Sequence, residues 1–101
     1  MIKTEQERFW QGEFGDEYIE RNQNSTLLAS NISFLSKIFN RTGKINSILE
    51  FGCNIGMNLK AIRTLLPESN LSGIEINKKA VDYLKNWKGG AHVIEGSILN
   101  I

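Results

Sequence analysis

The second half of the chain alternates between short apolar runs and longer segments in which apolar residues recur about every 3.6 positions. The short runs predict buried strands, at residues 47–51, 71–76 and 91–95. The periodic segments predict two helices, one over residues 56–66 and one capped by Asn77 and ended by Gly89 and Gly90. This order of elements predicts an α/β fold with a parallel βαβαβ sheet.

The first 43 residues carry helical patterns only. Thr4 and Glu7 have the spacing of a capping box, which predicts a short helix directly after them. Ser25 or Thr26 is expected to cap a longer amphipathic helix. We expect that helix to end before Gly43, with the glycine in the left-handed conformation.

The chain stops at Ile101, just after the third predicted strand and its loop. A sheet of three parallel strands is half of a doubly wound fold, so we expect the domain to be truncated. Its open edge and uncovered apolar surface predict self-association. A non-catalytic fragment that acts as an interaction module is therefore one hypothesis for its function.

Composition narrows the classes of partner. The 12 Lys and Arg residues nearly balance the 11 Asp and Glu residues, so no basic excess indicates a nucleic-acid partner. No apolar run approaches the roughly 20 residues that span a bilayer, and the N-terminus lacks a signal peptide, so no membrane association is expected. The single cysteine, Cys53, excludes an intramolecular disulfide and favours a reducing, cytoplasmic compartment.

The loop after the first strand holds the most specific pattern. Ligands of open parallel sheets bind beyond the carboxyl ends of the strands. Gly52 lets the chain turn sharply, and Gly56 lets the next helix pack closely. Asn54 stands where a dinucleotide fingerprint has its second glycine; its side chain crowds a pyrophosphate, although asparagine tolerates the left-handed turn. The acidic Glu50 suits a cationic ligand, which favours S-adenosylmethionine over NAD.

The loops after the other two strands offer partners for an adenosine. Glu75 follows Gly52 by roughly the 20 residues typical of an acidic ribose ligand, and it can accept from both hydroxyls. Ile76 offers an apolar wall for the base. Ser97 and Ile98 lie where a hydroxyl and backbone amides can reach the edge of the base.

These residues carry a family resemblance. The pattern of Glu50, Gly52, Asn54 and Gly56 followed by Glu75 resembles motifs one and two of class I S-adenosylmethionine-dependent methyltransferases, although glycine is commoner at the position of Asn54. The stretches FWQGEFGDEYIERN (9–22) and NIGMNL (54–59) are similar to the pseudaminic acid biosynthesis-associated methylases. The resemblance covers the whole chain, but only about the first half of such a methylase.

The resemblance implies the N-terminal part of a Rossmann-like methyltransferase fold, with a helical cap over residues 1–43 and a parallel half-sheet over residues 44–101. It implies that Glu50 holds the methionine ammonium, that Glu75 binds the ribose, and that Arg21 meets the cofactor carboxylate. The remaining implied roles are the methionine pocket (Gly52, Asn54, Gly56), the adenine site (Ile76, Ser97, Ile98) and the lid (Trp10, Phe14 or Tyr18).

The implied activity is methyl transfer from S-adenosylmethionine to a sugar or nucleotide-sugar of surface-glycan or flagellin modification. The fragment alone is expected to be inactive, and no catalytic residue or metal ligand is assigned. An NAD- or nucleotide-sugar-binding enzyme stays open as an alternative. Cys53 is interpreted as a small loop residue and His92 as a packed strand residue.

Overall fold

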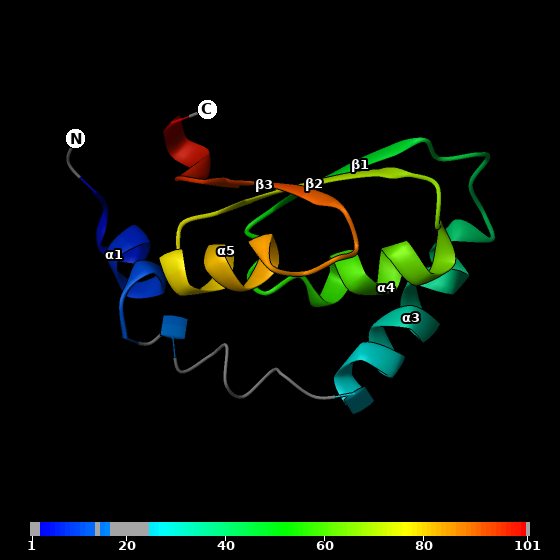
Figure 1. The fold of residues 1–101 in the computed structure, drawn as a ribbon, viewed down its shortest axis with the longest axis horizontal. Coiled ribbons are helices and arrows are strands. Elements are labelled where there is room, and N and C mark those ends of the chain that lie inside the picture. The colour runs from blue at the N-terminus through cyan, green and yellow to red at the C-terminus, as the bar shows by residue number, and fades with distance from the viewer. Residues whose placement is uncertain (1–2, 14, 17–24, 101) are drawn as a thin grey trace.

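The computed structural model describes residues 3–13, 15–16 and 25–100. A parallel sheet lies on one side, and the helices that connect its strands lie beneath it (Figure 1). The elements are α1 (Glu5–Gln11), α3 (Ser25–Phe39), β1 (Ser47–Phe51), α4 (Met57–Leu65), β2 (Asn70–Glu75), α5 (Lys78–Lys85), β3 (Ala91–Glu95) and the 3-10 helix η1 (Ile98–Asn100).

The sheet has the predicted parallel βαβαβ arrangement. Its order is β1-β2-β3, with Phe51, Ile74 and Ile94 in register across the three strands. The second strand begins and ends one residue earlier than predicted, so Ile76 lies just beyond its carboxyl end. The carboxyl ends of all three strands therefore meet at one edge, as the α/β pattern requires.

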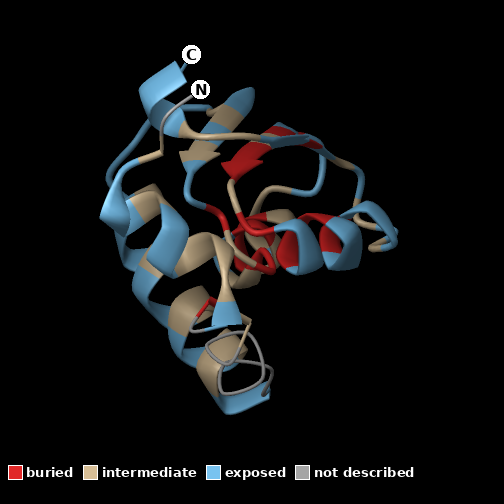
Figure 2. Ribbon diagram, turned by 90° about the vertical axis from the view of Figure 1, so that its left-hand side faces the viewer, coloured by how far each residue is buried: buried red, intermediate tan, exposed pale blue. Residues whose placement is uncertain are grey.

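The hydrophobic core lies between this sheet and the helices α4 and α5 (Figure 2). Side chains from alternate strand positions meet one face of each helix, which is the burial expected of amphipathic helices on a sheet. Leu35 and Phe39 of α3 pack against the edge of the same cluster. The buried members of the cluster are Cys53, Leu59, Ile62, Leu71, Val81, Leu84 and Val93.

The two helix caps nearest the strand ends follow the prediction. In the capping box, the Glu7 amide donates to Thr4 Oγ1 at 3.1 Å and the Thr4 amide donates to Glu7 Oε1 at 2.9 Å. Asn77 caps α5, because its Oδ1 accepts from the Ala80 amide at 2.9 Å. Both caps satisfy amides that have no partner within their helix.

Other predicted helix ends are wrong in detail. Ser25 and Thr26 already lie inside α3. Gly43 is not left-handed; instead, the Thr42 amide and hydroxyl both donate to the Phe39 carbonyl and close the last turn. Helix α5 ends at Lys85, before Gly89 and Gly90, and Gly90 (φ 81°) turns the chain toward β3.

The second face of the sheet is exposed at the outer strands β1 and β3, which corrects the interpretation of His92, whereas Ile74 on the central strand is only 5% exposed. His92 is on this face and is exposed rather than packed, because α4 and α5 cover only the opposite face. Leu49, Phe51 and Ile94 are 51%, 58% and 50% exposed on the same face. Parallel sheets are usually covered on both sides, so this apolar face is unusual.

We predict that Gly73→Ala destabilises the fold by about 1–3 kcal/mol, because an added methyl overpacks the core. A Cβ at Gly73 would lie 2.6 Å from Cys53 Sγ and 3.3 Å from Leu59 Cδ1. Urea denaturation measures the change. Gly43→Ala is the matched control, since a Cβ there meets nothing within 4 Å, and it should leave stability within about 0.5 kcal/mol. Equal stability of the two variants would contradict this packing.

We also predict that the exposed sheet face makes the chain self-associate. Sedimentation velocity should show a concentration-dependent dimer, and a double change of Phe51 and Ile94 to Lys should weaken it by more than about tenfold. Phe34→Lys is the control, because Phe34 is 65% exposed but belongs to α3. A monomer at every concentration up to the millimolar range would refute the prediction.

Candidate functional site

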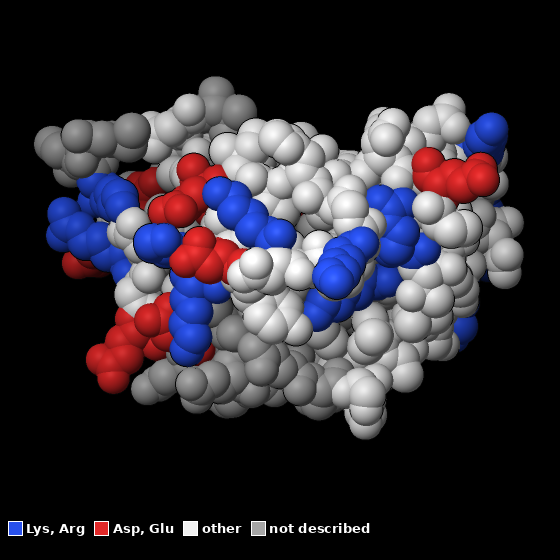
Figure 3. Space-filling view, viewed as in Figure 1, with Lys and Arg blue, Asp and Glu red and all other residues white. Residues whose placement is uncertain are grey.

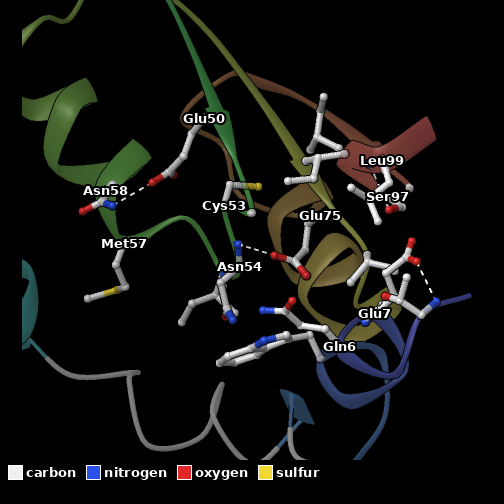
Figure 4. Close-up of a pocket in the computed structure, with 18 of the residues that line it drawn as sticks. Gln6, Glu7, Glu50, Cys53, Asn54, Met57, Asn58, Glu75, Ser97 and Leu99 are labelled. Atoms are coloured by element: carbon white, nitrogen blue, oxygen red, sulfur yellow. Dashed lines mark hydrogen bonds between the residues drawn. The ribbon is translucent and has the colours of Figure 1, made fainter. Parts of the chain in front are cut away.

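A pocket of about 620 Å³ opens at the carboxyl edge of the sheet (Figure 4). The loops after all three strands form one side of it, and α1, α3 and the start of α4 form the other. Its polar and charged lining residues are Thr4, Gln6, Glu7, Asn31, Glu50, Asn54, Asn58, Glu75 and Ser97; apolar lining comes from residues such as Trp10, Leu27, Ile55, Met57, Ile74, Ile76, Ile98 and Leu99. The volume is in the range of small-molecule sites.

The structure brings most of the predicted site residues together. Glu50, Gly52, Asn54, Glu75, Ile76, Ser97 and Ile98 all line this pocket. Gly56 does not line it but caps α4 directly behind it. Trp10, predicted for the lid, also lines the pocket, whereas Phe14, Tyr18 and Arg21 lie outside the described residues.

The loop between β1 and α4 has three left-handed residues in alternation. Gly52, Asn54 and Gly56 have φ values of 68°, 50° and 80°. Asn54 is the only non-glycine residue with positive φ in the described part of the chain, as predicted from its tolerance of this conformation. A Cβ on Gly56 would lie 2.4 Å from Leu84 Cδ2, which explains why only glycine lets the turn before α4 lie this close to α5.

Glu75 connects this loop to the start of α5. The residue is only 6% exposed, and its carboxylate accepts from the Asn54 amide at 2.7 Å and from the Asn77 amide at 2.9 Å. Each carboxylate oxygen has a further lone pair beyond these bonds. Glu75 therefore shapes the pocket wall and presents acceptor capacity to it (Figure 4).

Glu50 lies across the pocket from Glu75. Its Oε2 accepts from Asn58 Nδ2 at 2.7 Å, whereas its buried Oε1 has no hydrogen-bond partner among the described residues. Burial raises the pKa of Glu50, the hydrogen bond from Asn58 lowers it, and the charge of Glu75 raises it. A buried carboxylate oxygen without a partner is costly, and a bound cation would satisfy it.

The N-terminal segment is fastened to the pocket by Asn77, a role that the sequence did not reveal. Its Nδ2 lies within hydrogen-bond distance of the Trp10 carbonyl (3.1 Å), the Gln11 carbonyl (3.2 Å) and Asp16 Oδ1 (2.7 Å). On the opposite wall, the Ser97 hydroxyl lowers the pKa of Glu7, with a further contribution from the Thr4 amide. Helix α1 thus contacts the loops after β2 and β3.

Asn58 and Asn31 are further residues that sequence reasoning missed. Asn58 belongs to the NIGMNL stretch (54–59), which implies no role for it, and Asn31 is one of several polar positions in a long helix. The hydrogen bond between them joins residues 27 positions apart, so no local sequence pattern predicts it. Met57 beside them adds an apolar surface to the pocket.

Three further features of the described residues concern metal binding, membrane spanning and surface charge. Within residues 3–13, 15–16 and 25–100, no cluster of His, Cys, Asp and Glu could hold a metal ion. No helix in that part is long and apolar enough to cross a membrane. On the face shown in Figure 3, acidic and basic side chains are intermixed. Lys78 and Asp82 form an exposed ion pair at 3.0 Å.

No protein-family model and no curated protein sequence matches the chain. Solved structures do match its fold. The plantazolicin methyltransferase BpumL, in complex with a monoazolic desmethylPZN analog and S-adenosylhomocysteine (SAH), superposes with a TM-score of 0.66 and 23% identity over 95% of this chain and 40% of BpumL. The sugar N-methyltransferase KedS8 from Streptoalloteichus superposes with a TM-score of 0.63 and 14% identity over 90% of this chain and 35% of KedS8.

DesVI from Streptomyces venezuelae is a third similar structure, with a TM-score of 0.60 and 17% identity over 85% of this chain and 36% of DesVI. The chain thus spans about 40% or less of the length of these structures. Its fold is the N-terminal part of the Rossmann-like fold that these methyltransferases share, which confirms the predicted fold class.

We predict that Cys53 is unreactive, as expected of a small loop residue. Burial and the nearby charges of Glu75 and Glu50 raise the pKa of its thiol to about 12. At pH 8 roughly one thiol in ten thousand is then ionised, so iodoacetamide should react on the order of a thousandfold more slowly than with the same chain unfolded in guanidinium. Equal rates for folded and unfolded chain would contradict this environment.

Proposed function

We propose that the chain is the cofactor-binding part of an S-adenosylmethionine-dependent methyltransferase. The observation that carries the proposal is the buried, unpartnered Oε1 of Glu50 in a pocket that also holds the carboxylate of Glu75. With Glu7, three acids line this pocket, and they favour a ligand with positive charge and hydroxyl donors and disfavour a pyrophosphate. S-adenosylmethionine has an ammonium, a sulfonium and a ribose, and no phosphate.

The pocket residues divide between the parts of that ligand. In the proposal, Glu50 binds the ammonium and Glu75 accepts from the ribose hydroxyls through its remaining lone pairs. Ile76, Ser97 and Ile98 surround the adenine. Trp10 covers the pocket, and Tyr18 and Arg21 complete the lid and the carboxylate contact. The complexes of BpumL with SAH, the product of S-adenosylmethionine, support this choice of cofactor.

When bound, S-adenosylmethionine supplies an electrophilic methyl group on a sulfonium. The protein contributes alignment and exclusion of water, which are sufficient for many displacements of this kind. Gly52 and Asn54 are left-handed, and in the proposal their turns bring backbone rather than bulky side chains beside the methionine part. We assign no general base within the described residues.

For the acceptor, we propose a sugar or nucleotide-sugar of a surface-glycan or flagellin-glycan pathway such as pseudaminic acid biosynthesis, in the cytoplasm. The resemblance of segments 9–22 and 54–59 to that methylase family supports this class, as does the fold likeness to a sugar N-methyltransferase. We further propose that these 101 residues alone transfer no methyl group, because they span only about 40% of BpumL.

The proposal predicts that calorimetry of the chain with SAH shows one binding site and that NAD binds at least about tenfold more weakly. Glu75→Gln should weaken SAH binding by about tenfold or more, because it removes the charge-assisted acceptor of the ribose hydroxyls. Thermal denaturation of each variant separates lost affinity from lost folding.

Glu95→Gln is the matched control, since Glu95 is an exposed acid at the end of the neighbouring strand and does not line the pocket. It should leave SAH affinity unchanged. An absence of SAH binding at millimolar concentration would contradict S-adenosylmethionine as the cofactor. Stronger binding of NAD than of SAH would indicate a dinucleotide cofactor instead.

A further inference from the structure

We infer that Asn31 and Asn58 form a relay that positions Glu50 and makes the pocket selective for adenosine ligands that carry an ammonium group. The inference rests on the proposed function and adds to it two positioning residues from α3 and α4. Asn31 Nδ2 donates to Asn58 Oδ1 at 3.1 Å, and Asn58 Nδ2 donates to Glu50 Oε2 at 2.7 Å. The last member of the series, Glu50 Oε1, is buried and unpartnered among the described residues.

The relay has a fixed direction. An asparagine amide can turn over, and either its nitrogen or its oxygen can face a neighbour. Because the ionised Glu50 carboxylate can only accept, the Asn58 nitrogen faces Glu50, and the Asn58 oxygen is left to accept from Asn31 Nδ2. The reverse orientation would place the Asn58 oxygen against the carboxylate and the two nitrogens against each other. Asn31 therefore supports the orientation of Asn58 that stabilises a charged Glu50.

The relay also fixes which oxygen of Glu50 a ligand meets. Asn58 is exposed at the rim of the pocket and occupies Oε2, so Oε1 is the atom left for a cation (Figure 4). Asn31, Asn58 and Glu50 all line the pocket. A ligand with an ammonium beside Oε1 would form a charge-assisted hydrogen bond to an acceptor that is already oriented.

The electrostatic surroundings explain why Glu50 needs this donor. The titratable groups that act on Glu50 or respond to it within the described chain are Glu75 on β2 and Cys53 in the loop after β1. Neither supplies a positive charge, and burial with Glu75 raises the pKa of Glu50. The neutral amide of Asn58 is the group that lowers it, and it leaves the site's negative charge for the ligand.

The test compares two ligands on wild type and Asn58→Leu. SAH carries the ammonium, whereas 5′-methylthioadenosine has the adenosine and the sulfur without it. We expect the variant to lose about tenfold in SAH affinity and little in methylthioadenosine affinity, since one charge-assisted contact is weakened. We also expect the acid limit of SAH binding to move to higher pH, because Glu50 without its donor is protonated more easily.

Two further variants keep the inference falsifiable. Asn31→Leu should shift the SAH-to-methylthioadenosine ratio in the same direction but by less, because Asn58 remains and only its orientation is released. Asn86→Leu is the control, since Asn86 is an exposed asparagine at the far end of α5 whose Nδ2 donates to the Asp82 carbonyl at 3.0 Å. It should leave both affinities unchanged.

The outcomes separate the inference from the proposed function. If wild type does not bind SAH, the proposed function fails, and the relay fails with it. If wild type binds SAH and Asn58→Leu lowers the affinities for SAH and methylthioadenosine equally, or changes neither affinity, the relay is overturned while the proposed function stands. A selective loss of SAH affinity with the upward pH shift supports the relay.

Discussion

The pocket depends on one buried carboxylate. Glu75 at the end of β2 accepts from the backbone of the loop after β1 and from the backbone that begins α5, at 2.7 Å and 2.9 Å. A buried charge is stable only when hydrogen bonds satisfy it, and here two amides of the turns that the fold must make provide those bonds. Removing the acid would leave two amides unsatisfied as well as removing a charge.

The same carboxylate sets the electrostatic character of the site. Glu50, across the pocket, is raised in pKa by burial and by Glu75, and its second oxygen is buried without a partner in the described chain. Neighbouring acids of this kind cost stability in the empty protein. The hydrogen bond from Asn58 offsets part of that cost. A bound positive charge would offset more, so the cost and the proposed ligand preference have the same source.

Much of the fold was predictable from the sequence because its determinants are local. The apolar runs, the capping box of Thr4 and Glu7, the cap at Asn77 and the left-handed Asn54 each depend on a few neighbouring residues. Helix ends were less predictable: the Thr42 hydroxyl closes α3 where Gly43 was expected to. The exposure of His92 depends on what covers a sheet face, and local pattern carries no information on that.

The site divides in the same way. Residues placed by the carboxyl-end rule, such as Glu50, Glu75 and Ser97, do line one pocket. Asn31, Asn58 and the second role of Asn77 depend on contacts across 27 to 67 positions, which no motif or spacing encodes. For all of these residues, the structure gives the position in the pocket, and the role in ligand binding stays a prediction.

The hold of Asn77 on the N-terminal segment has a kinetic consequence. Its bonds to the Trp10 and Gln11 carbonyls close a loop of 66 to 67 residues, and such a closure gains nothing until β2 and the start of α5 are in place. Helix α1, which has no buried residues, therefore docks late in folding and opens early. One wall of the pocket is thus held to the strand ends by side-chain contacts of Asn77 and Ser97, and it can open while the sheet behind it stays closed.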